Sequence, residues 1–221
     1  EGMSASEARV LFCISILDEI IFKPSAAPHA SSLDAEGRRR VHCLSTVGFS
    51  TEAGRDAFLQ ILDDKRGRFS TLDAQCFECM TVAMKTFLDN CIDPRCVKAA
   101  LRLANMSITF HKLVEQEECG GESSTGESCK HYVQRESDIN QHELWHTVGF
   151  WNDALSHGLR KQIVMTEPVQ WDELEPDILN EKVMAIHNIL FGQLGTLAFT
   201  MHEMGLEKAY VQGLVMNLGQ A

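Results

Sequence analysis

Residues 144–159 read LWHTVGFWNDALSHGL, and this stretch is the clearest guide to the fold class. Its large apolar side chains recur at steps of three and four residues: Leu144, Val148, Trp151, Leu155 and Leu159. This spacing places them on one face of an α-helix, because the helical repeat is about 3.6 residues. The stretch therefore predicts a helix with one buried face, which Trp145 and Phe150 broaden. We expect Trp145 and Trp151 to be buried anchors.

Helical spacing and helix-end signals recur along most of the chain. They predict further helices at about residues 4–23, 34–44, 50–62, 70–90, 93–113, 176–204 and 207–218. Ser4-x-x-Glu7 has the form of a capping box, and Gly205 follows the longest of these helices as its expected cap. We find no alternation of period two that would indicate β-strands. The sequence therefore predicts an all-α fold, a single multi-helix bundle of about eight to nine helices.

Chain length and composition favour one domain. With 221 residues and 44% hydrophobic content, the chain is long enough to bury a substantial core, and we interpret residues 1–221 as a single helical domain. Gly, Ser, Thr and Glu dominate the middle of the chain near residue 120, so we expect a flexible surface loop at about 118–130. The chain does not begin with Met, and we expect it to be part of a longer protein.

The net charge limits the classes of expected binding partner, and the positions of the cysteines indicate the cellular location. The formal net charge of −11 repels phosphate backbones and anionic lipid surfaces, so nucleic acid is not an expected partner. No apolar run approaches the roughly 20 residues that span a bilayer, and we expect no membrane insertion. Cys13, Cys79 and Cys96 are three of eight cysteines and have helical apolar spacing, which favours free thiols and a cytoplasmic location.

Two cysteine pairs have short spacings. Cys76-x-x-Cys79 would suit half of a zinc site or a redox pair, but a three-residue step in a helix also places both side chains on one face. Core packing is the favoured interpretation of this pair. Cys91-x-x-x-x-Cys96 lacks metal-ligand spacing.

The pentapeptide His142-Glu143-Leu144-Trp145-His146 matches the zinc-protease signature H-E-x-x-H. Residues four apart on a helix face the same way, so His142 and His146 could hold Zn²⁺ while Glu143 acts as the base on the bound water. The motif alone leaves a zinc metalloprotease open as an alternative function.

A zinc site of this kind needs a third ligand. The longer form of the motif would supply it at position 152, where this chain has Asn152, a poor zinc ligand. Asp153 is one step out of register, and Glu173 and Glu181 remain open as distant donors. No strand pattern is available to bind a peptide edge-on. No nucleophile elbow and no glycine-rich phosphate loop occurs either, so we predict no catalytic residue, no cofactor and no metal site.

Two blocks carry a resemblance to known proteins: residues 144–152, LWHTVGFWN, and residues 191–199, FGQLGTLAF. Here the chain resembles a helical region of set-binding-factor-type myotubularin-related proteins and of an uncharacterised neuronal cytoplasmic relative. Around residues 150–154, FWNDA, it is more distantly similar to the C-terminal part of the MAP kinase-activating death domain protein. These are proteins of Rab and vesicle regulation, and several carry DENN exchange modules elsewhere in the chain.

The resemblance implies a non-enzymatic protein-interaction or scaffold domain of a vesicle-trafficking regulator. It implies no catalytic residues for this region, and in the neuronal relative the positions aligned with His142 and Glu143 do not hold a His-Glu pair. The expected partners are other proteins: a component of a Rab pathway, or a neighbouring domain of the same chain that this region would restrain.

Residues of the two blocks are the candidates for structural or interaction roles. These candidates are Trp145, Phe150, Trp151, Phe191, Gly192 and Gly195. Gly192 and Gly195 lie inside a predicted helix, where each costs about 1 kcal/mol relative to Ala. We therefore expect them to permit a close helix contact or a kink.

Overall fold

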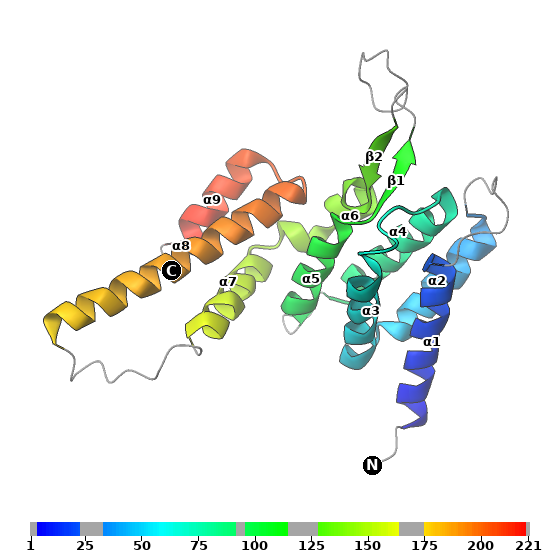
Figure 1. The fold of residues 1–221 in the computed structure, drawn as a ribbon, viewed down its shortest axis with the longest axis horizontal. Helices are drawn as coiled ribbons and strands as arrows, with labels where there is room; N and C mark the ends of the chain where they lie inside the picture. The colour runs from blue at the N-terminus through cyan, green and yellow to red at the C-terminus, as the bar shows by residue number, and fades with distance from the viewer. Residues whose placement is uncertain (1–3, 23–32, 92–95, 115–127, 164–174, 220–221) are drawn as a thin grey trace. The chain divides into compact units, whose positions relative to one another are not determined.

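A computed structural model describes residues 4–22, 33–91, 96–114, 128–163 and 175–219 of the chain. Nine α-helices and a two-stranded sheet form the regular structure of these ranges, which confirms the predicted all-α class (Figure 1). The chain divides into two compact units, which we call unit 1 (Glu1–Leu144) and unit 2 (Trp145–Ala221). The single domain over residues 1–221 stays a prediction.

The described part of unit 1 contains six α-helices, and four of them lie close to predicted ranges. Their bounds are α1 Ala5–Phe22, α2 Ala35–Gly48, α3 Glu52–Lys65, α4 Ala74–Asp89, α5 Val97–Ser107 and α6 Ser137–Asn140. The capping box of α1 is present: Glu7 Oε2 accepts from the Ser4 amide at 2.8 Å, and Ser4 Oγ accepts from the Glu7 amide at 3.2 Å. Asp73 caps α4 by accepting from the Cys76 amide at 2.7 Å.

Aromatic side chains form the centre of the unit 1 core. Phe49, Phe58 and Phe87 are fully buried, and their ring centroids lie 4.8, 5.1 and 6.1 Å apart. Phe49 directly follows α2, Phe58 lies within α3 and Phe87 lies within α4. One aromatic cluster therefore joins three helices. The N-terminal helix α1 packs against α2, α3 and α4 and closes this core (Figure 1).

An antiparallel hairpin of β1 (His111–Val114) and β2 (Cys129–Tyr132) shows that the predicted absence of strands was wrong. The helix expected to reach residue 113 ends as α5 at Ser107. Beyond it, His111 N donates to the Ser70 carbonyl at 2.9 Å, and the His111 carbonyl accepts from Leu72 N at 2.8 Å. These bonds to a distant segment favour an extended backbone over the local helical pattern. Neither strand alternates strictly between buried and exposed positions, so no period-two signal existed.

The cysteines of unit 1 mostly carry thiols, as expected. Among the described residues, five of the six thiols are buried, and the exposed one is Cys43. Cys129 in β2 is disulfide-bonded, so the expectation of free thiols is wrong at this residue. Most of the loop predicted at about 118–130 lies outside the described residues. The cytoplasmic location stays a prediction.

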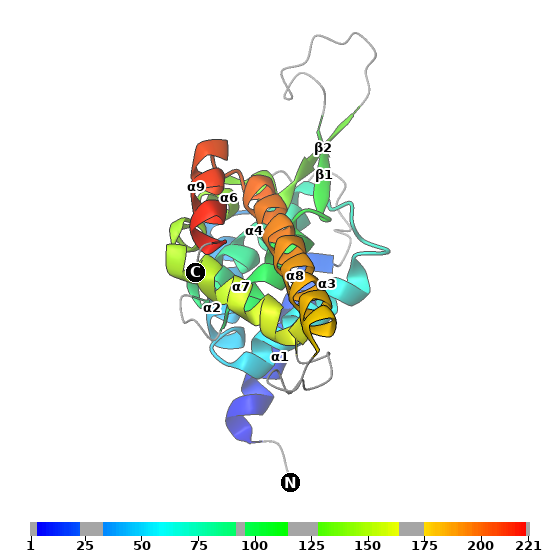
Figure 2. The same cartoon turned by 90° about the vertical axis from the view of Figure 1, so that its left-hand side faces the viewer.

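Unit 2 contains α7 (Val148–Ile163), α8 (Pro176–Glu203) and α9 (Lys208–Leu218), each packed against the other two (Figure 2). The predicted turn between α8 and α9 is present, with Gly205 at a positive φ of 75° that favours glycine. Gly158 of α7 lies against α8, because a Cβ there would clash with the side chain of Gln193. The two helices therefore approach closely at this position.

The burial of α7 and α8 differs from the predicted stripes. Trp151 and Leu155 are buried on α7 as expected, but Val148 is 48% exposed because it is the first residue of the helix. On α8, Leu194, Leu197 and Met201 are buried in the second half. The first half exposes much of its apolar surface: Ile178, Val183 and Met184. The expectation that α8 buries its whole stripe was therefore wrong.

Candidate functional site

The H-E-x-x-H pentapeptide does not lie on an α-helix. Glu143–His146 form a 3₁₀ turn, His142 precedes it, and α7 begins only at Val148. Residues four apart share a face on an α-helix, but not on a 3₁₀ helix with about 3.0 residues per turn. The predicted helical placement of the two histidines was therefore wrong.

His142 has a structural role in unit 1. It is buried, its Nε2 lies 3.1 Å from Asp89 Oδ1, and its Nδ1 accepts from the Leu144 amide at 3.3 Å. Because Nδ1 is the acceptor, Nε2 carries the proton and donates it to Asp89. Both ring nitrogens are thus used within the protein, and neither presents a lone pair to a metal ion.

Asp89 at the end of α4 receives hydrogen bonds from two side chains, Lys85 and His142. Burial raises the pKa of this carboxyl group, but hydrogen bonds from Lys85 and His142 outweigh it and lower the pKa below its usual value. The Lys85 ammonium donates to Asp89 Oδ2 at 2.9 Å. Asp89 is therefore ionised at neutral pH and fixes the orientation of the His142 ring.

His146 is placed differently from His142. It belongs to unit 2, its side chain is exposed, and its ring centroid lies 6.2 Å from that of Tyr210 in α9. Its backbone carbonyl accepts a hydrogen bond from the Tyr210 hydroxyl at 2.9 Å. This bond ties the turn before α7 to α9.

The proposed third ligands do not complete a site in the described ranges. Glu173 lies outside the described residues, Asp153 is exposed on α7, and Glu181 is exposed on α8. Across the part of the chain that the structure describes, no group of three or more His, Cys, Asp or Glu side chains is arranged to hold a metal ion. The geometry gives the zinc metalloprotease no support.

We expect the purified chain to contain no stoichiometric zinc. Substituting His146 with Ala should leave the metal content unchanged, because the exposed His146 and the doubly hydrogen-bonded His142 do not form a ligand pair. Elemental mass spectrometry of both proteins after dialysis is the measurement. One zinc ion per chain that is lost in His146→Ala would contradict this expectation.

The candidates around the first block, Trp145, Phe150 and Trp151, are buried in unit 2. The Trp151 indole Nε1 donates to the Trp145 carbonyl at 2.8 Å. The Phe150 ring lies edge-on to both indoles, with centroids 5.5 Å from Trp145 and 4.9 Å from Trp151. The predicted burial of both tryptophans is confirmed, and these three side chains are structural rather than partner-facing.

The candidates in the second block lie on the exposed side of α8. Phe191 is 70% exposed, and no atom lies within 4 Å of a Cβ built on Gly192 or Gly195. The close helix contact, one of the two roles expected for these glycines, is therefore wrong among the described residues, and the kink stays a prediction. Instead they leave open space beside Phe191.

An apolar hollow of about 460 Å³ lies between α8 and α9. Its lining residues are Phe191, Leu194, Gly195, Ala198, Val215, Met216 and Gly219. Met216 of this lining is 65% exposed, and Phe199, which follows the lining residue Ala198 on α8, is 58% exposed. We call Phe191, Phe199, Met216 and this hollow the apolar face of unit 2. Exposed apolar surface gathered in this way is not explained by the core of unit 2.

The part of the apolar face that α9 contributes was missed in the sequence. The buried stripe of α9 is Val211, Leu214 and Leu218, with the three- and four-residue steps of a single face. Val215 and Met216 are apolar residues outside that stripe. The sequence therefore did contain a signal for this face: α9 has more large apolar residues than one buried helical face can hold.

The apolar character of α8 also bears on the membrane prediction. By length and composition α8 is able to cross a membrane, and few of its residues are buried. Core helices of water-soluble proteins meet the same two criteria, and His187, Asn188 and Gln193 interrupt the apolar sequence of α8. The absence of membrane insertion stays a prediction.

Comparisons of the chain with protein family models, with curated proteins and with solved structures find no match. The resemblance to the myotubularin-related and DENN-linked proteins at residues 144–152 and 191–199 therefore stays a prediction.

Proposed function

We propose that the chain is a non-enzymatic protein-interaction domain and that it binds its partner through the apolar face of unit 2. The observation that carries this proposal is the exposure of Phe191 and Met216 in a hollow with an apolar lining, together with the exposed Phe199 on α8. Contiguous exposed apolar surface of this kind is typical of protein-binding sites. Single exposed apolar residues, such as Phe12 on α1, are common on any protein and carry no such implication.

The form of the face favours a helical partner. Two neighbouring helices, α8 and α9, line an open apolar hollow, which suits the apolar side of an amphipathic helix. Full burial of one large apolar side chain contributes about 1.5–3 kcal/mol, and ordering of both partners offsets part of that gain. With Phe191 and Met216 as the main anchors, we expect transient binding with a Kd of roughly micromolar order.

The cellular context of the proposal comes from the resemblance to vesicle-trafficking regulators. The block at residues 191–199 begins and ends with Phe191 and Phe199, the two exposed phenylalanines of the apolar face. We propose a partner in a Rab pathway, or a neighbouring DENN-type module of the same polypeptide. The formal net charge of −11 favours a partner segment with basic residues beside its apolar anchors.

The test is a binding screen with defined proteins. The purified chain is immobilised and exposed to a panel of purified Rab GTPases in GDP and GTP states and to purified DENN modules. We expect at least one of these proteins to bind, and we expect Phe191→Glu or Met216→Glu to weaken that binding at least about tenfold. Phe12→Glu is the matched control, because Phe12 is a similarly exposed phenylalanine on α1.

Two outcomes would contradict the proposal. Binding that is equally sensitive to Phe12→Glu, or insensitive to Phe191→Glu and Met216→Glu, would remove the apolar face from the interaction. Failure of every member of the panel to bind, together with co-sedimentation of the chain with phosphatidylcholine vesicles, would reassign the face to a lipid surface.

A further inference from the structure

An arginine-containing segment joins α3 to α4. This α3–α4 linker consists of residues 66–73 and reads RGRFSTLD. Arg66 and Arg68 precede Thr71 by five and three residues. No other serine or threonine of the chain has arginines at both of these positions. The linker belongs to unit 1, so it has no part in the proposed binding face, which belongs to unit 2.

The spacing of the arginines is one that a class of protein kinases recognises. Kinases distinguish their substrates by charge patterns, and basophilic serine/threonine kinases bind arginines that precede the acceptor hydroxyl in an acidic groove. A guanidinium group is always charged and forms paired hydrogen bonds with carboxylates. The formal net charge of the chain is −11, so a basic composition does not account for the pattern. The sequence Arg-x-Arg-x-x-Thr therefore favours Thr71 as a phosphate acceptor.

The structure exposes the residues that this recognition requires. Residues 66–69 and Thr71 are exposed, and no atom lies within 4 Å of a Cβ built at Gly67. The side chain of Arg66 is 51% exposed, and its Nε lies 3.0 Å from Asp63 Oδ1. Exposed ion pairs of this kind contribute little to stability, so this pair does not prevent Arg66 from binding a kinase.

The backbone of the linker is irregular, which suits the extended conformation of a kinase substrate. The amides of Arg68 and Phe69 donate to the Lys65 carbonyl in a turn, and two further hydrogen bonds join the linker to His111. Leu72 is buried and anchors the end of the linker. Segments without regular secondary structure open locally at a lower cost than core helices. The linker is therefore able to enter a kinase groove while α3 and α4 stay folded.

The acceptor hydroxyl contacts a buried histidine of β1. Thr71 Oγ1 lies 3.1 Å from His111 Nε2, and His111 Nδ1 lies 3.4 Å from the Thr109 carbonyl oxygen. Because a carbonyl oxygen only accepts, Nδ1 carries the proton of the neutral ring, and Nε2 accepts from the Thr71 hydroxyl. This hydrogen bond joins the linker to the β1–β2 hairpin.

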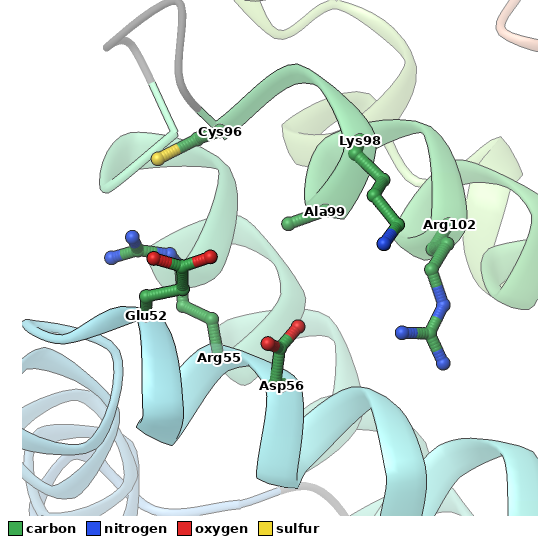
Figure 3. A pocket seen from close by; sticks show the side chains of 7 residues that line it. All are labelled: Glu52, Arg55, Asp56, Cys96, Lys98, Ala99 and Arg102. Carbon is green, nitrogen blue, oxygen red and sulfur yellow. The ribbon is translucent and has the colours of Figure 1, made fainter. Parts of the chain in front are cut away.

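Two serines with half of the pattern serve as internal comparisons. Arg40 precedes Ser45 by five residues, and Arg102 precedes Ser107 by five residues. Both serines are buried, with exposed fractions of 0% and 1%. Figure 3 shows that Arg102 extends from α5 beside a pocket that α3 and α5 line, so this arginine belongs to a regular helix. We expect a basophilic kinase to leave both serines unmodified.

We propose that Thr71 is a phosphorylation site for a basophilic serine/threonine kinase. Thr71 Oγ1 attacks the γ-phosphorus of ATP, the bond from that phosphorus to the β–γ bridging oxygen breaks, and ADP leaves. The hydroxyl proton passes to the catalytic aspartate of the kinase. The phosphate adds a charge of about −1.5 to −2. It replaces the hydrogen that His111 Nε2 accepts and repels the nearby Asp73 carboxylate, so it weakens the contact between the linker and β1.

The test treats the complete chain with purified protein kinase B and ATP, and maps modified peptides by mass spectrometry. We expect about one phosphate per chain, on Thr71. Thr71→Ala should abolish the modification, and Thr71→Ser should retain it. Changing Arg66 and Arg68 together to Gln should slow the reaction at least about tenfold. Arg39→Gln with Arg160→Gln is the matched control, because both arginines are exposed but precede no serine or threonine by three or five residues.

Hydrogen exchange of the modified chain measures the structural effect. The Leu72 amide donates to the His111 carbonyl, and the His111 amide donates to the Ser70 carbonyl. We expect both amides to exchange at least about threefold faster after phosphorylation, while amides of α9 exchange at an unchanged rate.

Several results would overturn the proposal. These are the absence of phosphate on Thr71 in the folded chain, and a double Arg66/Arg68 variant that reacts as fast as the original chain. Modification of Ser70 by casein kinase 2, with no reaction at Thr71, would assign the linker to an acid-directed kinase, because Asp73 follows Ser70 by three residues. Unchanged exchange of the two amides would contradict the structural effect. Circular dichroism confirms that each variant is folded before the comparison.

Discussion

Trp151→Ala is expected to lower the free energy of unfolding by about 3–5 kcal/mol, enough to unfold unit 2 in a protein of ordinary stability. The indole is fully buried, and its removal leaves a large cavity beside Trp145 and Phe150. The change also deprives the Trp145 carbonyl of the indole N–H that donates to it at 2.8 Å.

Urea unfolding followed by circular dichroism at 222 nm measures this loss. Phe199→Ala is the control, because Phe199 is an aromatic residue of the same unit that is 58% exposed. Its effect should stay within about 0.5 kcal/mol. Equal losses for Trp151→Ala and Phe199→Ala would show that burial in unit 2 differs from the structure described above.

Signals that act within a few residues predicted the helices well. The Ser4–Glu7 capping box, Asp34 and Gly205 each mark a helix end in the structure as they do in the sequence. The helix predicted to start at residue 70 begins as α4 at Ala74, with Asp73 as its cap. These signals work because a cap satisfies backbone groups only three or four residues away. The predicted start of α3 at residue 50 was one residue early, because the neighbouring Thr51 supplies the oxygen that caps the helix.

Features that depend on distant contacts were not predictable in the same way. The β1–β2 hairpin depends on bonds between His111 and residues 70–72, a segment some 40 positions earlier in the chain. Apolar residues of α8 occur on more than one side of the helix, so periodicity could not distinguish its buried residues from Phe191. The hydrogen bond of His142 likewise depends on a distant residue, because Asp89 lies 53 positions earlier in the chain.

The candidate sites illustrate the same limit. The H-E-x-x-H pattern predicted a metal pair on the assumption of an α-helix, and the 3₁₀ turn at Glu143–His146 removes that assumption. His142 instead contacts Asp89 of α4, and the His146 carbonyl accepts from the Tyr210 hydroxyl of α9. Spacing identifies side chains that share one helix face, but not side chains that contact a distant element.

Gly54→Ala is expected to lower the free energy of unfolding by about 3 kcal/mol, although Ala is the better helix former by about 1 kcal/mol. Gly54 lies in the first turn of α3, where α1 and the end of α2 converge. A Cβ there would clash with the Gly48 carbonyl oxygen and lie 2.6 Å from Val10 Cγ1. The carbonyl is backbone and has no rotamer to move away, so α2 or α3 has to shift.

Gly195→Ala provides the opposite case in a helix of unit 2. No atom lies within 4 Å of a Cβ built at Gly195, so the added methyl group meets open space. We expect this variant to be more stable by about 0.5–1 kcal/mol through helix propensity alone. Thermal unfolding of both variants gives the comparison. A stabilised Gly54→Ala would mean that the three helices do not converge at that residue, and a destabilised Gly195→Ala would restore the close helix contact first expected there.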